Sequence, residues 1–247
     1  MRIPVLRGVI ERRILANFHV DPDVLAKLLP SPFRPQLVDG RGVAGICLIR
    51  LKQVRPRFTP ALMGISSENA AHRIAVEWDE NGETKAGVYI PRRDTSSRLN
   101  TLVGGRLFPG VHHHARFAVR EHGDDYSVVM DSDDDDTHVA VEGHLTAGWP
   151  ERSVFGSIQD ASDFFRCGAV GYSAAAAAGS YDGLELRTAS WNVESLAVDR
   201  VESSFFADSR LFPAGSVEFD GALLMRNIKH EWHRRPQKRG AVRNSTA

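Results

Sequence analysis

The feature that most constrains the fold is a succession of short β-rich runs separated by turn signals. Near the middle of the chain, Asn81-Gly82 stands between the runs 65–78 and 85–90. This dipeptide favours a two-residue hairpin turn, because both residues tolerate positive φ. Further β-rich runs are predicted at 43–54, 111–120, 126–130, 137–146, 184–191, 194–206 and 215–220. Strands and helices do not alternate regularly, so one α+β domain around a large antiparallel sheet is predicted.

Few segments have the features of helices. Asp21 is a suitable N-cap and Pro22 a suitable first residue for a helix over 21–29. Helices are also predicted within 95–104 and over 160–178, which includes an alanine run, whereas 223–232 has helical spacing but could extend a strand. The domain is expected to span residues 1–235, and the polar residues 236–247 are expected to form a disordered basic tail.

The charge balance and the cysteine content restrict partners and location. Lys+Arg and Asp+Glu both number 31. Nucleic-acid-binding domains normally carry a basic excess, so no nucleic-acid partner is expected. No apolar run approaches the ~20 residues of a membrane helix, and charged residues interrupt the N-terminus where a signal peptide needs an apolar block. The two cysteines make no disulfide framework, so a cytoplasmic protein without a membrane partner is predicted.

The acidic run 131–136 copies part of the spacing of a calcium-binding EF-hand loop. Its sixth position is Asp136, where the sharp turn of that loop requires glycine. The predicted neighbours are strands, whereas an EF-hand has helices. A solvated hairpin tip is therefore the preferred interpretation.

Three consecutive histidines, His112, His113 and His114, begin a predicted strand. Side chains alternate between the faces of a strand, so only His112 and His114 share a face. A catalytic metal site needs about three protein ligands, and the sequence does not identify the third. Imidazoles that line a cavity are the preferred interpretation, and neither a metal nor another cofactor is expected.

Motifs of nucleophilic and nucleotide-binding enzymes are absent from the sequence. It contains no G-x-S-x-G, no G-x-G-x-x-G and no phosphate-binding loop. Arg92-Arg93-Asp94 stands at a predicted strand-to-helix junction, where cations and helical N–H groups favour an anionic ligand. A solvated basic turn paired with Asp94 explains the same residues equally well.

Several longer segments resemble one protein family in order and spacing. FHVDPDVLAKLLPSPFRP (18–35) and GVYIPRRDTSSRLNTLVGGRLFPG (87–110) are similar to segments of the acetoacetate-decarboxylase-like superfamily. Segments such as GYS, YDGLEL, VESSFF, FPAGSVEFD and ALLMRNIKHEWH are similar to its YqjF-like branch, a bacterial domain of unknown function. The resemblance covers about residues 10–235. It implies a cone-shaped, mostly antiparallel β-barrel with a few flanking helices and an enclosed ligand cavity.

The resemblance does not extend to the catalytic lysine. True acetoacetate decarboxylases form a Schiff base through a lysine beside a second lysine. That pair follows the position of Gly105-Arg106, where this chain has no lysine. The superfamily's carboxylate-binding arginine corresponds to His19. Schiff-base decarboxylation is therefore not expected.

The candidate site is assembled from these observations. His112 and His114 are the candidate acid–base residues, because the pKa of histidine lies near the operating pH. Glu68 and Arg73 occupy opposite faces of one predicted strand, so at most one of them points inward. The candidate substrate-binding residues are Arg106, Arg92, Arg73, Glu68 and His19.

The predicted function is to hold a small, anionic, oxo-acid-like metabolite in the cavity. A non-catalytic binding module and a lyase or hydrolase using histidine acid–base chemistry are the alternatives, and a structural or assembly protein is a third. The ligand, the presence of a reaction and the formation of a homo-oligomer stay open.

Overall fold

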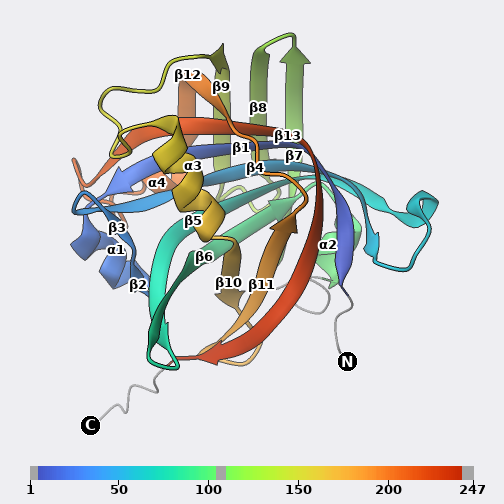
Figure 1. Cartoon of the computed structure of the whole chain (residues 1–247), viewed down its shortest axis with the longest axis horizontal. Coiled ribbons are helices and arrows are strands. Elements are labelled where there is room, and N and C mark those ends of the chain that lie inside the picture. The colour runs from blue at the N-terminus through green and yellow to red at the C-terminus, as the bar shows by residue number, and fades with distance from the viewer. Residues whose placement is uncertain (1–4, 104–109, 241–247) are drawn as a thin grey trace.

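The computed structural model of the chain describes residues 5–103 and 110–240. A mixed sheet of 13 strands dominates this part of the molecule, and a few helices flank it (Figure 1). The strand order is β11-β10-β6-β7-β8-β9-β12-β13-β1-β4-β5-β2, with β3 on β4 and additional pairings β11–β13 and β6–β5. The predicted α+β class with many strands and few helices is confirmed.

Five long strands form the centre of the sheet. They are β1 (Leu6–Val20), β4 (Arg41–Pro56), β5 (Ile65–Glu80), β6 (Glu83–Thr95) and β13 (Val217–Arg239). The short strands β2 (Arg34–Pro35) and β3 (Leu37–Val38) lie at the edge, and a 3₁₀ turn, η1 (Ala61–Met63), connects β4 to β5. The predicted β5–β6 hairpin is present, with φ of 54° at Asn81 and 81° at Gly82. These positive values explain why this dipeptide makes the turn.

The first helix, α1 (Pro22–Leu28), is the one predicted over 21–29. Its N-cap is Asp21, whose side-chain Oδ1 accepts a hydrogen bond from the backbone N–H of Asp23 at 2.8 Å. The second helix, α2 (Arg98–Val103), lies inside the predicted window 95–104. No helix in residues 5–103 and 110–240 is both long and apolar enough to span a membrane.

The strands β7 (His112–His122), β8 (Asp125–Ser132) and β9 (His138–Thr146) pair in sequence as antiparallel neighbours. Residues 133–136 of the acidic run lie in the turn between β8 and β9, as predicted, whereas residues 131 and 132 end β8. Strand β12 (Glu194–Ser203) continues this sheet and leads into the short helix α4 (Ser204–Ala207). Two pairings of β6 are parallel, however, because β6 pairs with β7 and β10 in that direction while it pairs with β5 in the antiparallel direction. The sheet is therefore mixed and not wholly antiparallel.

The predicted helix over 160–178 is only partly correct. Helix α3 (Ile158–Cys167) ends at Gly168, and the chain then enters β10 (Val170–Ala174) and β11 (Ser180–Thr188). Residues 170–174 pair with β6 and β11, and the remaining alanines, 175–178, lie in the connection between β10 and β11. Tertiary contacts of the two strands thus override the helical propensity of this segment.

The C-terminal part of the described chain is a single long strand. Residues 223–232, whose spacing was compatible with a helix, belong to β13. Residues 236–239, which were expected in a disordered tail, continue this strand. Pairing with β11 and an ion pair of 2.5 Å between Lys238 Nζ and Glu80 Oε1 hold this end in place.

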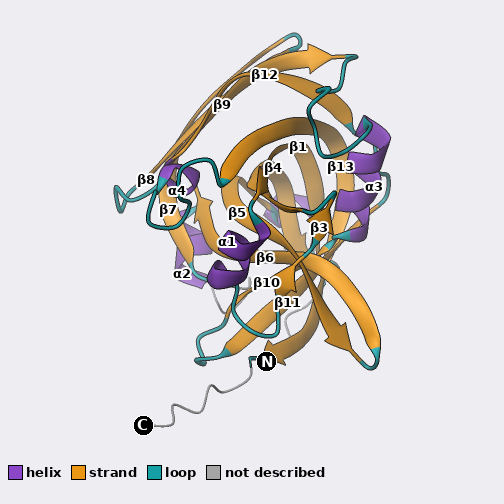
Figure 2. Cartoon of the chain, turned by 90° about the vertical axis from the view of Figure 1, so that its left-hand side faces the viewer, coloured by secondary structure: helices purple, strands orange, loops and turns teal. Residues whose placement is uncertain are grey.

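The central strands are buried on both faces. Ile14 of β1 belongs to a large core cluster that includes Leu25 of α1. Its neighbour Leu15 belongs to a second cluster, which contains Ala161 and Phe165 of α3. The helices α1 and α3 accordingly cover different sides of these strands (Figure 2). The side of the strands that faces α3 also borders the main cavity.

Candidate ligand-binding site

A cavity of about 250 Å³ is lined mainly by strands of the sheet, and Phe165 of α3 contributes to its lining. Strands β1, β4, β5, β6, β10, β11 and β13 contribute to its lining, as do α2, α3 and the start of β7. Most of the lining is apolar and includes Ile49, Val88 and Trp191. Pockets for drug-sized ligands occupy about 300–1,000 Å³, so this cavity suits a small metabolite.

Four arginines and one carboxylate, that of Asp94, line this apolar cavity. Arg55 of β4 donates to the carbonyl oxygens of Gln53 and Thr59, and Asp94 pairs with Arg92. The other three arginines are the candidates for binding a ligand. Arg13 comes from β1, Arg73 from β5 and Arg93 from β6. Within residues 5–103 and 110–240, none of the three forms an ion pair with a carboxylate, and residues 1–4, 104–109 and 241–247 contain no Asp or Glu. A cation removed from water is costly unless an anion compensates it. The cavity therefore has the electrostatics of an anion-binding site.

Arg73 is the most deeply buried of these cations, with 4% of its surface exposed. Its Nη2 donates a short hydrogen bond to Asn17 Oδ1, and its Nε has no hydrogen-bond partner among the described residues. Burial lowers the pKa of Arg73 to about 10, so the group stays charged at neutral pH. Gly45 lies opposite on β4, and a Cβ there would lie 3.3 Å from Arg73 Nη2. The absence of a side chain at Gly45 makes room for the guanidinium.

Arg93 reaches the cavity because of an irregularity in β6. Between the pairs Ile74–Tyr89 and His72–Arg92, β6 contains one residue more than β5. This extra residue shifts the alternation of side chains, so Arg93 lines the same cavity as Val88. Its Nε donates to Ser173 Oγ at 3.2 Å, and burial lowers its pKa to about 10.

Arg13 contacts sulfur atoms and an aromatic ring. Its Nε lies 3.4 Å from Cys47 Sγ and its Nη1 lies 3.9 Å from Met225 Sδ. The guanidinium carbon is 6.0 Å from the centroid of the Trp191 ring. These are weak acceptors for a cation, so Arg13 keeps its capacity to bind an anion.

His112 lines the cavity beside Arg93, its partner in the parallel β6–β7 ladder. Its Nδ1 is 3.3 Å from the carbonyl oxygen of Gly110, which only accepts, so Nδ1 carries the proton and donates. Burial, followed by the charge of Arg93, lowers the pKa of His112 to about 3. The imidazole is therefore neutral at neutral pH, whereas a general acid would require the protonated imidazolium form.

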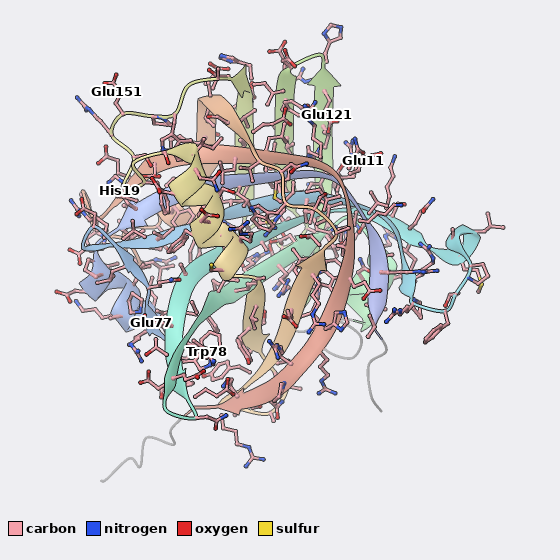
Figure 3. The ribbon with its side chains drawn as sticks, viewed as in Figure 1. Glu11, His19, Glu77, Trp78, Glu121 and Glu151 are labelled. Carbon is pink, nitrogen blue, oxygen red and sulfur yellow. The ribbon has the colours of Figure 1, made fainter. Side chains whose placement is uncertain are left out.

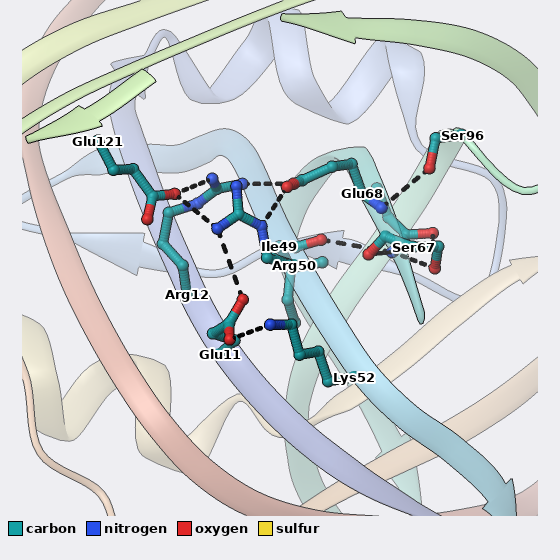
Figure 4. Close-up of polar contacts among 10 residues, drawn as sticks. Glu11, Arg12, Ile49, Arg50, Lys52, Ser67, Glu68, Ser96 and Glu121 are labelled. Atoms are coloured by element: carbon teal, nitrogen blue, oxygen red, sulfur yellow. Dashed lines mark hydrogen bonds and ion pairs between the residues drawn. The ribbon is translucent and has the colours of Figure 1, made fainter. Parts of the chain in front are cut away.

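The structure brings Arg73 and His112 together at the cavity, whereas Glu68 lies elsewhere. The Glu68 carboxylate binds Arg12 Nη2 at 2.5 Å and also binds Arg50 (Figure 4). Arg12 Nη1 lies 2.6 Å from Glu121 Oε1. Glu68 and Arg73 thus point to opposite sides of β5, as the alternation in the sequence predicts.

Arg92, His114 and His19 are not among the residues that line the cavity. Arg92 Nη2 lies 2.9 Å from Asp94 Oδ1 and 2.8 Å from Asp134 Oδ2. His114 Nδ1 lies 2.6 Å from Asp133 Oδ2. His19, near the end of β1 (Figure 3), lies 3.3 Å from Glu218 Oε2 through its Nε2 and 3.5 Å from Asp220 Oδ1 through its Nδ1. Arg106 lies outside the described residues.

Sequence reasoning did not single out Arg13 or Cys47, and it named Arg93 only within the run Arg92-Arg93-Asp94, from which Arg92 was selected as the candidate. A signal for Arg13 is present: two consecutive arginines, Arg12-Arg13, interrupt an apolar strand, so one of them must face each side. For Arg93, the signal is Pro91, since proline within a strand indicates an edge or a bulge that changes the alternation.

All five lysines lie in the described part of the chain, and none of them lines the cavity. Lys52 forms an ion pair of 2.5 Å with Glu11, and Lys229 is exposed. Among the described residues, no group of three or more His, Cys, Asp or Glu side chains is arranged to hold a metal ion.

Comparison with known proteins assigns the family. Residues 9–218 match the model of DUF2071, described as "Uncharacterized conserved protein (COG2071)", and the chain belongs to this family. No curated protein sequence matches the chain at a significant level.

Solved structures show the fold. The acetoacetate decarboxylase of Legionella pneumophila has a TM-score of 0.62 at 9% identity, covering 92% of this chain and 84% of its own. An acetoacetate decarboxylase-like enzyme from Sphingomonas wittichii RW1 has a TM-score of 0.61 at 12% identity, covering 97% and 94%. The enduracididine biosynthesis enzyme MppR complexed with pyruvate has a TM-score of 0.59 at 10% identity, covering 97% and 91%. The chain therefore has the acetoacetate-decarboxylase-like fold expected from its sequence.

Proposed function

We propose that the cavity binds a small oxo-acid-like anion through Arg13, Arg73 and Arg93. One observation carries this proposal: Arg13, Arg73 and Arg93 line one apolar cavity, and no carboxylate of the described residues pairs with any of them. Asp94 also lines the cavity, but its carboxylate pairs with Arg92. Guanidinium groups bind carboxylates through paired, charge-assisted hydrogen bonds. The complex of MppR with pyruvate, a protein of similar fold, supports a 2-oxo acid as the first ligand to test.

The proposal excludes Schiff-base chemistry. A Schiff base needs an amine within reach of the ligand carbonyl, and no lysine lines the cavity. The protein is therefore proposed to hold its ligand without the amine step of true acetoacetate decarboxylases.

Histidine acid–base chemistry is the weaker alternative. His112 is the cavity histidine, and its pKa of about 3 leaves it neutral at the pH where it would have to donate a proton. His114 is engaged with Asp133 away from the lining. A neutral His112 serves better as a hydrogen-bonding group that orients the ligand.

The proposal includes closure of the sheet into a single cone-shaped barrel around the ligand. The pairings β11–β13 and β6–β5 support it, because each connects strands that are distant along the order of the sheet. Following neighbours from β13 through β1, β4, β5, β6, β10 and β11 returns to β13. A closed ring of strands leaves no free edge around the cavity.

Calorimetric titration with pyruvate and with its uncharged methyl ester tests the function. Pyruvate is expected to bind and the ester is expected to bind much more weakly. Arg73→Met and Arg93→Met should each weaken binding by about 10- to 100-fold, because a hydrogen bond to a charged group contributes about 1.5–3 kcal/mol. Arg200→Met is the matched control, since Arg200 pairs with Glu142 and Glu202 at the surface. Equal binding of acid and ester, or unchanged affinity in both cavity variants, would refute the proposal.

A further inference from the structure

A cysteine lines the cavity together with Arg13, Arg73 and Arg93. Cys47 is on β4, lines the cavity and has 8% of its surface exposed. Its Sγ accepts a hydrogen bond of 3.4 Å from Arg13 Nε. Register places Cys47 opposite Ala71 of β5, and Ala71 opposite Arg93 of β6. The three residues thus form one row across neighbouring strands on the cavity side, with only a methyl group between the thiol and Arg93.

A second observation indicates that a ligand belongs beside this thiol. Arg73 stands two residues along β5 from Ala71, and Gly45, its partner on β4, stands two residues from Cys47. The Arg73 side chain is almost completely buried, yet its Nε has no hydrogen-bond partner among the described residues. A buried donor without a partner is rare in native proteins. An anion in the cavity beside Cys47 supplies the missing negative charge.

We propose that Cys47 is a nucleophile that adds reversibly to the carbonyl carbon of a 2-oxo acid held by these arginines. This inference rests on the proposed function. A bond forms between Sγ and the carbonyl carbon, the C=O π bond opens, and the thiol proton moves to the former carbonyl oxygen. The product is a hemithioketal, and no oxidant, reductant or further reactant is needed.

The surroundings of Cys47 suit this addition. Thiols are intrinsically strong nucleophiles, and the cavity has no lysine to compete for the carbonyl. Negative charge develops on the carbonyl oxygen during the attack, and fixed guanidinium groups in a site sheltered from water stabilise such charge. The arginines would therefore both hold the ligand carboxylate and assist the addition.

Alkylation of the unmodified protein tests the position of the thiol. The two free cysteines provide an internal comparison, because Cys47 is in the cavity whereas Cys167 is exposed at the end of α3. The rate ratio of iodoacetate to iodoacetamide should be about tenfold or more higher at Cys47 than at Cys167, since a cationic pocket concentrates anions. Pyruvate should slow the modification of Cys47 and leave that of Cys167 unchanged. Equal ratios at the two cysteines, or no protection by pyruvate, would overturn the inference.

Carbon-13 NMR with pyruvate labelled at its carbonyl carbon tests bond formation. A new resonance of a tetrahedral carbon is expected with the parent protein and with Cys167→Ser, and not with Cys47→Ser. If calorimetry detects pyruvate binding but no such resonance forms, the nucleophile is refuted while the proposed function stands. If pyruvate does not bind at all, both fail. The alkylation experiment needs no variant, so a negative result there overturns the inference even if Cys47→Ser does not fold.

Discussion

The guanidinium of Arg73 lies over the ring of Phe165, 4.4 Å from its centroid. Phe165 belongs to α3, so the helix that covers this side of the sheet also provides the face on which the cation rests. A desolvated cation–π contact contributes about 2 kcal/mol and does not neutralise the charge. The contact therefore holds Arg73 in place while leaving its charge to act on the cavity.

Two buried arginines should differ sharply in their contribution to stability. Arg12→Met should lower the free energy of unfolding by about 3 kcal/mol or more, because it leaves Glu68 and Glu121 without their buried partner. Arg73→Met should cost less, about 1–2 kcal/mol, because the loss of the contacts with Asn17 and Phe165 is partly offset by removal of a buried charge that has no carboxylate partner. Urea denaturation of both variants measures the difference. Equal losses would contradict the assignment of Arg73 to ligand binding.

The space at Gly45 is expected to be essential. In Gly45→Ala, the new Cβ would lie 2.5 Å from the carbonyl oxygen of Ala16 and 3.3 Å from Arg73 Nη2. The variant should lose about 1–3 kcal/mol of stability from overpacking, and its affinity for pyruvate should fall as Arg73 is displaced. Gly148→Ala is the control, since the nearest atom to its Cβ would be 3.6 Å away. Denaturation and calorimetry on both variants check this expectation.

Stability should fall as the pH is lowered below 6.5. Burial, followed by the charge of Arg92, lowers the pKa of His72 from 6.5 to about 3. Below pH 6.5, His72 therefore binds a proton in the unfolded chain, whereas in the folded protein it stays neutral down to about pH 3. At pH 5 this one histidine should cost about 2 kcal/mol relative to pH 7.5. His112 and His230, whose pKa values burial lowers to about 3 and about 4, act in the same direction.

The contribution of His72 can be isolated by substitution. His72→Leu should reduce the difference in unfolding free energy between pH 7.5 and pH 5 by about 2 kcal/mol. Ser203→Ala is the matched control, because it removes the hydrogen bond of 3.1 Å from the His72 ring and keeps the titrating group. An unchanged pH difference in His72→Leu would show that this imidazole is not buried in its neutral form.

The loop that connects β4 to β5 exposes large apolar side chains without relying on them for stability. Phe58 is 95% exposed and Leu62 is 97% exposed. Phe58→Ser and Leu62→Ser should each change the unfolding free energy by less than about 0.5 kcal/mol. Leu48→Ala, at a fully buried position of β4, should cost about 2–5 kcal/mol. Urea denaturation compares the three, and a large loss at Phe58 would mean that the loop packs against the domain.

Local signals were sufficient for some elements. The cap at Asp21 and the turn at Asn81-Gly82 depend on residues adjacent in sequence, so the first helix and the central hairpin are predictable. The strand 223–232 is different, because its periodicity is ambiguous and pairing with β1 and β11 decides its conformation. Such pairing partners lie too far away along the chain to be recognised from local pattern.

Some residues of the cavity can likewise be predicted from local pattern, whereas others depend on strand register. Alternation correctly separates Glu68 from Arg73, because no irregularity intervenes between them on β5. On β6, Val88 and Ile90 line the cavity, so strict alternation would place Arg92 there as well. The extra residue of β6 before Arg92 shifts the alternation, and Arg93 lines the cavity instead. The proximity of Cys47 to Arg13 depends on the β1–β4 register, which the sequence alone does not reveal.

Strand β13 pairs with β1, β11 and β12. It is the last strand of the described chain in sequence order, so it is synthesised after its three partners. Leu6 of β1 pairs with Trp232 of β13, almost the whole chain apart. Contacts between residues so far apart in sequence form slowly, because the entropy of closing a long loop is lost before the contacts can stabilise the chain. During synthesis, the edge of β1 that pairs with β13 therefore stays unpaired until the residues of β13 have been made.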